Sequence, residues 1–250
     1  MPQLSVCIAT YNGEKYIKEQ LDSILHQIGE NDEVIISDDC STDKTIPIIE
    51  CFNDPRIQLF KHNIKFKNFA FNFENALKKS SGEIIFLADQ DDIWIENKVK
   101  RFLETFEEIE TNVVVSDCFL VNARREPISN SYHKIRNARS GFLKNFYKNS
   151  FTGCCMAFNR KVLEASLPFP KGAFSHDNWI GLIGEIIGKT YFLREQLIYF
   201  RRHGKNFSHH SLGDTILTNK SPNSFSKKII LRLILFKMLV PRIIKLLIRS

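Results

Sequence analysis

The chain has 250 residues, of which 43% are hydrophobic and 25% charged, and its 35 Lys and Arg against 28 Asp and Glu give a net charge of +7. This composition excludes wholesale disorder and allows one large α/β domain or two small ones, while the positive balance favours an anionic partner such as a nucleotide, a nucleic acid or an acidic lipid. Six cysteines without a Cys-x-x-Cys pair and an N-terminus without a signal-peptide pattern predict reduced thiols in the cytoplasm.

Strands and helices are predicted to alternate through the first 110 residues. Short apolar runs bounded by turn residues indicate strands at 4–9, 34–37, 57–61 and 84–88. Apolar residues at helical spacing indicate helices at 17–28, 46–49, 69–77 and 99–109. Such alternation implies right-handed crossovers, and therefore a mostly parallel α/β sheet flanked by helices.

The alternation is lost after residue 110. Further apolar runs indicate strands at 113–117, 151–158 and 197–200. A short helix is expected to begin at Ser175 or Asp177, because both residue types favour helix starts. The polar and basic segment 122–150 is expected to be irregular.

The last part of the chain has a different character. Residues 204–226 are rich in Ser, Asn, His and Gly, which is typical of a linker. Residues 227–249 alternate apolar residues with Lys and Arg, place Arg242, Lys245 and Arg249 on one helical face, and contain Pro241, which is expected to split this tail into two short helices. A basic amphipathic tail predicts an interfacial anchor on an anionic membrane surface. The alternatives are a helix packed on the domain and a partner-binding helix.

Three carboxylates follow the predicted strand at 84–88. Asp89, Asp91 and Asp92 end an apolar run, and in open α/β sheets the carboxyl ends of the strands are where ligands bind. Clustered carboxylates resist ionising together, and a hard divalent cation such as Mg²⁺ or Mn²⁺ relieves that conflict. The cluster therefore predicts a site for a metal and a diphosphate. The alternative is an acidic loop in which Asp92 caps the next helix.

Five segments in order resemble the motifs of family 2 glycosyltransferases and of their bacterial, rhamnosyltransferase-like members. These segments are 5–12, 37–43, 89–94, 176–179 and 199–206, so the resemblance covers roughly residues 3–210. It implies a GT-A fold with a Rossmann-like sheet, a UDP- or dTDP-sugar donor, Mn²⁺ or Mg²⁺, and usually an inverting displacement. The implied acceptor is a saccharide or a lipid-linked saccharide, in the synthesis of a bacterial surface polysaccharide such as the lipopolysaccharide O antigen or a capsule.

The resemblance also implies how the chain is divided. We expect a glycosyltransferase domain over 1–215, with a nucleotide-sugar half at 1–110 and an acceptor half at 111–215. The linker and the basic helical tail are expected at 216–250. The tail would hold a cytoplasmic enzyme peripherally on the inner face of the cell membrane.

The family motifs assign roles to individual residues. Asp91 is the expected direct metal ligand, with Asp92 or Asp89 as the second. Asp39 resembles the carboxylate that accepts a hydrogen bond from the base N–H, and Cys40 beside it, where Gly is common, makes a positive φ less expected there. The complete set expected at the donor is Thr10, Tyr11, Asn12, Asp38, Asp39, Asp89, Arg201, Arg202 and His203.

Asp177 resembles the catalytic base of the family. A carboxylate at this position would take the proton of the acceptor hydroxyl. The alternative is helix capping by Asp177, in which case Asp117 or Glu185 would be the next candidates for the base. The residues expected beside the acceptor are Gly153, Cys154 and Trp179, although adjacent cysteines in a strand are more often packing groups.

Two other functions use similar features. A nucleotidyltransferase also uses carboxylates and a metal, but the N-terminal part lacks a Gly-rich, Lys-bearing phosphate loop. A non-catalytic nucleotide- or nucleic-acid-binding protein would suit the net charge. However, the basic residues are not interleaved with aromatic ones on one face, so no nucleic-acid partner is expected.

Overall fold

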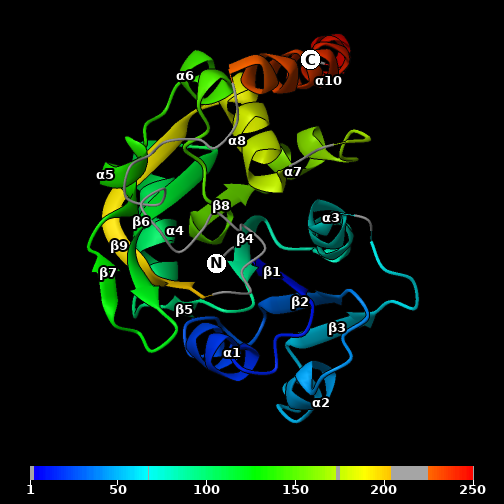
Figure 1. Ribbon diagram of the computed structural model, residues 1–250, viewed down its shortest axis with the longest axis vertical. Helices are drawn as coiled ribbons and strands as arrows, with labels where there is room; N and C mark the ends of the chain where they lie inside the picture. The colour runs from blue at the N-terminus through cyan, green and yellow to red at the C-terminus, as the bar shows by residue number, and fades with distance from the viewer. Residues whose placement is uncertain (1–2, 67, 173–174, 204–224, 250) are drawn as a thin grey trace.

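The computed structural model describes residues 3–66, 68–172, 175–203 and 225–249, and in this part of the chain one sheet of nine strands forms the centre (Figure 1). The spatial order of the strands is β3-β2-β1-β4-β8-β6-β9-β5, with β7 beside β6. The strands are β1 Leu4–Thr10, β2 Glu33–Asp38, β3 Ile57–Lys61, β4 Ile84–Asp89, β5 Ile93–Trp94, β6 Val113–Asn122, β7 Pro127–Ser129, β8 Met156–Asn159 and β9 Thr190–Arg202.

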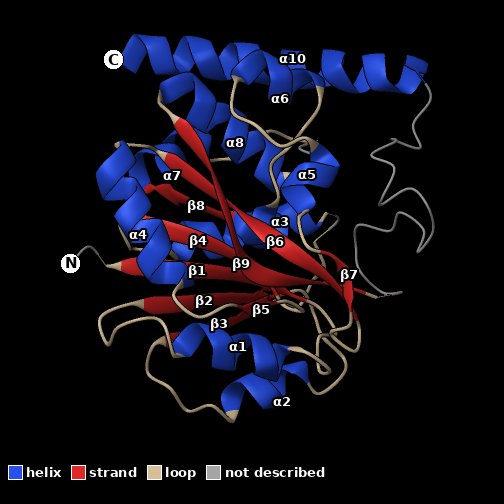
Figure 2. Ribbon diagram, turned by 90° about the vertical axis from the view of Figure 1, so that its left-hand side faces the viewer, coloured by secondary structure: helices blue, strands red, loops and turns tan. Residues whose placement is uncertain are grey.

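Helices cover the sheet from both sides (Figure 2). They are α1 Ile17–Leu25, α2 Thr45–Glu50, α3 Phe69–Lys79, α4 Lys98–Ile109, α5 Tyr132–Arg136, α6 Phe142–Tyr147, α7 Arg160–Ser166, α8 His176–Ile187 and α10 Phe225–Arg249, with one 3₁₀ turn at Gly153–Cys155. The helix α8 packs against α3, α6 and α7, whereas α1 packs against α2 and β5.

The first half of the sheet is parallel, as the sequence predicts. Strands β1, β2, β3 and β4 pair in parallel, and β1, β2 and most of β4 are buried. Their apolar runs fit this position, because a parallel strand is covered by helices on both faces. The carboxyl ends of these strands consequently meet at one edge, where the acidic motif begins.

The second half of the sheet is mixed. Strand β8 lies antiparallel between β4 and β6, and it joins the two halves of the chain into one sheet. Strand β9 runs parallel to β6, whereas β5 and β7 pair antiparallel with their neighbours. The segment between β6 and β8 contains β7, α5 and α6, and the chain then returns along β6 in the opposite direction, so β8 pairs antiparallel with β6.

Several local expectations need correction. The segment 122–150 is not irregular, because it contains β7, α5 and α6. The predicted strand at 151–158 is a 3₁₀ turn followed by the short β8, and α7 was not predicted. Asp92 precedes β5 and does not cap a helix. Both predicted starts of α8 are close, since Ser175 is its N-cap and Asp177 lies in its first turn.

The tail is one helix, and the predicted break at Pro241 is wrong. α10 continues through Pro241, where the neighbouring Leu239 is buried and Arg242 is hydrogen-bonded to the domain. Packing on the domain therefore outweighs the lost backbone hydrogen bond. The boundary at 215 and the predicted linker up to residue 224 lie outside the described residues, whereas the last two residues of that linker, 225 and 226, begin α10. In the described part, no helix is both long and apolar enough to cross a membrane.

Candidate active site

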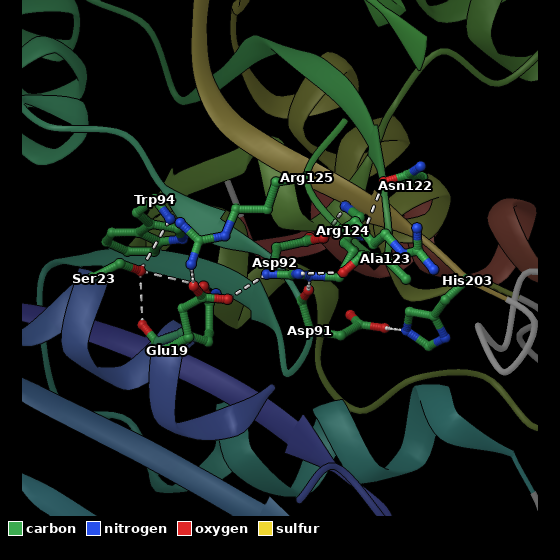
Figure 3. Close-up of polar contacts among 12 residues, drawn as sticks. Glu19, Ser23, Asp91, Asp92, Trp94, Asn122, Ala123, Arg124, Arg125 and His203 are labelled. Carbon is green, nitrogen blue, oxygen red and sulfur yellow. Dashed lines mark hydrogen bonds and ion pairs between the residues drawn. The ribbon is translucent and has the colours of Figure 1, made fainter. Parts of the chain in front are cut away.

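The acidic motif meets the end of β9 at the carboxyl edge of the sheet. Nε2 of His203 lies 2.8 Å from Oδ2 of Asp91, and the His203 ring stacks on Tyr16 with centroids 4.8 Å apart. Figure 3 shows this pair beside the turn that carries Asp91 and Asp92. Two motifs that are 112 residues apart in the chain thus form one side of a single site.

Asp92 points inward from the same turn. It is fully buried, and its Oδ1 accepts a hydrogen bond from the backbone N–H of Arg201 at 2.9 Å. Its Oδ2 is buried and has no hydrogen-bond partner among the described residues. Burial and the charges of Asp91 and Asp89 raise the pKa of Asp92 well above its usual value.

Arg201 binds the backbone of the turn that carries Asp91 and Asp92. It is 3% exposed, and its guanidinium donates to the carbonyls of Asp91 at 2.9 Å and Ala123 at 3.1 Å and pairs with Glu19. Glu19 also pairs with Arg125, so α1, the β4 turn and the loop after β6 are tied together (Figure 3). The predicted contact of Arg201 with a diphosphate is therefore a less suitable role for this buried side chain than positioning of Asp91.

Asp89 lies at the end of β4, next to the same turn. Burial, followed by the negative charges of Asp91 and Asp177, raises the pKa of Asp89 to about 7, although the positive charges of Arg202 and Lys98 oppose this shift. The negative charge of Asp177, at the start of α8, is thus close enough to affect Asp89. Arg202 is mostly buried, with its guanidinium 4.9 Å from the Phe200 ring.

These carboxylates fit a hard divalent cation. Ligand atoms of Asp89, Asp92 and Cys154 lie within 4.8 Å of one another, and Oδ2 of Asp92 is buried without a hydrogen-bond partner among the described residues. Carboxylate oxygens are ligands that Mg²⁺ and Mn²⁺ prefer, whereas the sulfur of Cys154 is a softer ligand. A hydrogen bond with Cys155 and burial raise the pKa of the Cys154 thiol, which keeps it neutral.

The loops after β1 and β2 form the neighbouring part of the edge. Asp38 is fully buried and accepts hydrogen bonds from Oγ1 of Thr10 at 2.8 Å and from the backbone and hydroxyl of Ser41 at 2.8 and 2.6 Å. Asn12 joins the same loops, since its Oδ1 accepts from the backbone N–H of Thr42 at 2.8 Å. The side chains of Thr10, Asn12 and Asp38 therefore hold the loops after β1 and β2 together.

Cys40 corrects an expectation. The sequence predicts that a cysteine at this position avoids a positive φ, but the φ of Cys40 is +62°. The Asp38–Ser41 hydrogen bonds hold the turn on one side, and the Cys40 thiol donates to the carbonyl of His62 at 3.1 Å on the other. Local hydrogen bonding thus stabilises a left-handed residue without glycine.

Asp39 and Tyr11 lie at the open side of this edge. Asp39 is half-buried, and its Oδ1 accepts from the backbone N–H of Phe66 at 2.6 Å. Tyr11 is 42% exposed and accepts a hydrogen bond from Lys65, whose Nζ lies 4.1 Å from the ring centroid. Gln90 links Tyr11 to the acidic motif, because its side-chain amide pairs with the backbone of Tyr11 at 2.9 and 3.0 Å.

Asp177 lies beside Gly153 and His176. Its Oδ1 accepts hydrogen bonds from the hydroxyl of Ser175 and from the backbone N–H of Asn178. A Cβ at Gly153 would lie 2.8 Å from Nε2 of His176 and 3.6 Å from Cβ of Asp177, so only glycine allows the 3₁₀ turn to approach this closely. The His176 ring stacks on Phe73 at 4.0 Å, and burial lowers its pKa to about 4.

Two predicted acceptor residues are in the interior. Trp179 is 2% exposed and its indole N–H donates to the carbonyl of Ser166 at 2.9 Å, so the prediction that it contacts the acceptor is corrected to a packing role. Cys154 is 1% exposed. Asp117, the reserve candidate for the base, is also buried and accepts hydrogen bonds from Ser131, His133 and other groups.

Lys98 is a site residue that the sequence analysis missed. It is fully buried, donates to the carbonyl of Cys154 at 3.0 Å, and has its Nζ 4.0 Å from the Trp94 ring. Burial lowers its pKa to about 8, against the opposing influence of nearby groups that include Asp92. One feature of the sequence could have indicated that Lys98 is buried, because it lies one helical turn before Phe102, on the apolar face of the helix.

The chain resembles known proteins over much of its length. Residues 5–167 match the family model for glycosyl transferase family 2. An uncharacterised glycosyltransferase of Nostoc sp. is 26% identical over 82% of this chain and 66% of its own length. The dTDP-rhamnosyl transferase RfbG of Shigella flexneri is 38% identical over 39% of this chain and 36% of its own length.

A further relative is WfaP of Escherichia coli, a UDP-Glc:alpha-D-GlcNAc-diphosphoundecaprenol beta-1,3-glucosyltransferase. It is 39% identical over 42% of this chain and 43% of its own length. The matched part thus spans between 36% and 66% of the length of these relatives.

Two solved structures share the fold. Staphylococcus aureus TarS, residues 1–349 in complex with UDP-GlcNAc, matches with a TM-score of 0.67 and 23% identity over 84% of this chain and 62% of that chain. The mannosyltransferase PcManGT of Pyrobaculum calidifontis, with GDP-Man and Mn²⁺, matches with a TM-score of 0.61 and 22% identity over 82% of this chain and 59% of that chain. The predicted fold class is confirmed.

Proposed function

Because the chain belongs to glycosyl transferase family 2, we propose that it transfers a sugar from a UDP- or dTDP-linked donor to a saccharide or lipid-linked acceptor. The proposed setting is the synthesis of a bacterial surface polysaccharide, such as an O antigen or a capsule, on the cytoplasmic side of the membrane. The observation that carries the proposal is the approach of two motifs. A Cβ at Gly153 would lie 3.6 Å from Cβ of Asp177, and a ligand atom of the next residue, Cys154, lies within 4.8 Å of ligand atoms of Asp89 and Asp92. Six free cysteines agree with a cytoplasmic location.

The nucleoside is proposed to bind at the loops after β1 and β2. Asp39 and Tyr11 are accessible there, while Asp38 and Thr10 hold the loops in place. A carboxylate that accepts the ring N–H of uracil or thymine discriminates against bases that lack this donor. The dTDP-sugar and UDP-sugar named for the relatives support this choice of donors.

The diphosphate is proposed to bind between the acidic motif and the end of β9. Asp89 and Asp92, whose ligand atoms lie within 4.8 Å of each other, would hold Mn²⁺ or Mg²⁺ together with Asp91 of the same turn. His203, which lies 2.8 Å from Asp91, and Arg202 would approach the phosphates. When bound, such an ion stabilises the charge that develops on the leaving nucleoside diphosphate. Arg201 keeps Asp91 in position through its hydrogen bond to the Asp91 carbonyl.

Asp177 is proposed as the base of an inverting displacement. The acceptor hydroxyl oxygen forms a bond to the anomeric carbon while the bond from that carbon to the diphosphate oxygen breaks, and the electron pair leaves with the diphosphate. The carboxylate of Asp177 takes the hydroxyl proton. Gly153 allows the acceptor-side turn to approach Asp177 closely.

The direct test is a screen of the purified protein against UDP-, dTDP- and GDP-sugars. Release of the nucleoside diphosphate is measured with Mn²⁺, with Mg²⁺ and with EDTA. The proposal expects release from a UDP- or dTDP-sugar that stops in EDTA. Exclusive use of a GDP-sugar would overturn the donor assignment, and full activity in EDTA would overturn the metal assignment.

A further inference from the structure

The helix α10 is attached to the catalytic domain along one face. Leu239 on this inner face is 1% exposed. Arg242 donates from Nη1 to the carbonyls of Ala165 at 2.9 Å and Leu167 at 2.6 Å. Arg232, almost three turns earlier, donates to the carbonyl of Tyr147 at 3.1 Å. Two charged hydrogen-bonding points, ten residues apart on the helix, fix its orientation on the domain.

The opposite face of α10 is apolar and open. Six of its apolar side chains are more than half exposed, namely Ile230, Leu233, Phe236, Ile244, Leu247 and Ile248. A soluble domain rarely exposes a continuous apolar stripe of this length, and such a surface marks an interaction site. The stripe is not a consequence of poor packing, because the inner face of the same helix is buried on the domain.

The helix α6 extends this apolar surface. Leu143 and Tyr147 are 78% and 67% exposed and lie one turn apart on α6. Tyr147 is directly beside α10, since the guanidinium of Arg232 lies 4.3 Å from its ring centroid as well as on its carbonyl. Figure 1 shows α6 and α10 side by side at the top of the molecule. Two elements from distant parts of the sequence therefore form one surface.

The charge of α10 selects the partner. The helix contains seven Lys and Arg residues and no Asp or Glu. Lys237 and Lys245 are exposed at the apolar stripe, where long side chains keep their ammonium groups in water while their methylene groups cover apolar surface. A second copy of the chain would bring an equal positive charge to this face. An anionic bilayer instead offers an apolar interior beneath negative headgroups.

We propose that the outer face of α10, together with Leu143 and Tyr147 of α6, docks on an anionic lipid bilayer with α10 lying in the plane of the interface. The attachment is rigid, because Arg232 and Arg242 hold the helix on the domain. In Figure 2 the helix lies across the top of the molecule, so the docked bilayer leaves the carboxyl edge of β1, β2 and β4 uncovered. The proposal does not depend on the donor or on the catalytic residues.

The test is flotation of the full chain with vesicles of phosphatidylcholine alone or with 30% phosphatidylglycerol. Binding is expected only to the anionic vesicles and should weaken in high salt. Leu233→Ser with Phe236→Ser should weaken binding about tenfold or more, because two apolar side chains are lost from the interface. Ile64→Ser is the matched control, because Ile64 is an 84% exposed apolar residue that belongs to neither α6 nor α10. This variant should bind vesicles like the parent.

Two further variants separate the proposal from its alternatives. Leu143→Ser should weaken vesicle binding several-fold, which a docking surface confined to the tail would not predict. Lys237→Glu with Lys245→Glu should remove the preference for anionic vesicles. Unchanged circular dichroism and unchanged donor hydrolysis in solution show that fold and catalysis are intact.

Three results would overturn the proposal. The first is equal binding to neutral and anionic vesicles, and the second is binding by the α10 double variant that matches the parent. The third is a dimer in sedimentation experiments that the same double variant converts to a monomer, together with no binding of the parent to vesicles. That last result would identify the face as an interface between copies. Loss of donor hydrolysis with intact vesicle binding would contradict the enzymatic proposal alone.

Discussion

Nε2 of His203, just after β9, lies 2.8 Å from Oδ2 of Asp91, just after β4. The two residues come from the third and the fifth of the five family motifs, and the buried Arg201, near His203 in the chain, donates a hydrogen bond to the backbone carbonyl of Asp91. This contact places the basic residues at the end of β9 beside the carboxylates that are proposed to hold the metal. The following predictions start from this pair.

Removal of Asp91 should abolish metal binding and leave the fold intact. Mn²⁺ is expected to raise the melting temperature of the parent, because a ligand that binds only the folded state stabilises it. Asp91→Ala should lose this increase and its transferase activity. Asp22→Ala on the surface of α1, where Asp22 pairs with Lys18, is the control and should retain both. A normal Mn²⁺ response in Asp91→Ala would remove Asp91 from the metal site.

Asp38 and Asp39 are adjacent but should respond differently. Asp38→Ala leaves Thr10 and Ser41 without their buried acceptor and should lower the free energy of unfolding by roughly 2–4 kcal/mol. Asp39→Ala should weaken UDP or dTDP binding by about 10- to 100-fold with a smaller effect on stability. Calorimetric titration and thermal melting of both variants measure the difference. Unchanged UDP and dTDP affinity in Asp39→Ala would contradict base reading.

His176 should make the protein sensitive to acid. Its pKa is about 4 in the folded protein, below the ordinary value of 6.5, because the ring is buried. Between pH 4 and 6.5 this histidine is protonated in the unfolded chain but neutral in the folded protein, and its protonation favours the unfolded state. The contribution of the neutral His176 to the free energy of unfolding is therefore complete above pH 6.5 and is lost as the pH falls towards 4. The expected loss is about 3 kcal/mol. Melting of the parent and of His176→Gln across this range should give a shallower pH dependence for the variant, and parallel curves would contradict the assignment.

Lys98 should balance the charge of the acidic site. Lys98→Met removes a positive charge that lowers the pKa of Asp89 and also removes the donor to the Cys154 carbonyl. The variant should melt at a lower temperature in EDTA and show a larger Mn²⁺-induced increase than the parent, because the carboxylates then repel one another more strongly. Lys100→Met, on the exposed side of α4, is the matched control. An Mn²⁺ response equal to that of the parent would contradict charge balance.

The parallel half of the fold was predictable from local pattern. The strand at 57–61 coincides with β3, and the apolar runs at 4–9 and 84–88 lie within β1 and β4. β1 and β4 are buried on both faces, so their apolar composition alone distinguishes them, whereas β3 lies at the edge of the sheet and is only partly buried. The carboxylates Asp89, Asp91 and Asp92 were placed correctly at a strand end for the same reason.

The misses depend on contacts between distant residues. Arg201 pairs with Glu19, 182 positions earlier, so no local pattern separates this internal role from phosphate binding. The sequence predicts that Trp179 contacts the acceptor, but its buried indole donates a hydrogen bond to Ser166 at the end of α7. α10 continues through Pro241 because Arg242 binds carbonyls of the domain, and tertiary contacts of this kind override local propensity.

The most direct measurement of the central claim is the kinetics of Asp177→Asn. Asparagine keeps the size and the hydrogen-bonding oxygen of the side chain, but it cannot accept a proton at neutral pH. The account predicts a fall in kcat of roughly 10²–10⁴ with nearly unchanged donor Kd and melting temperature. The unchanged melting temperature controls for damage to the start of α8. An Asp177→Asn protein that turns over like the parent would contradict the proposed base.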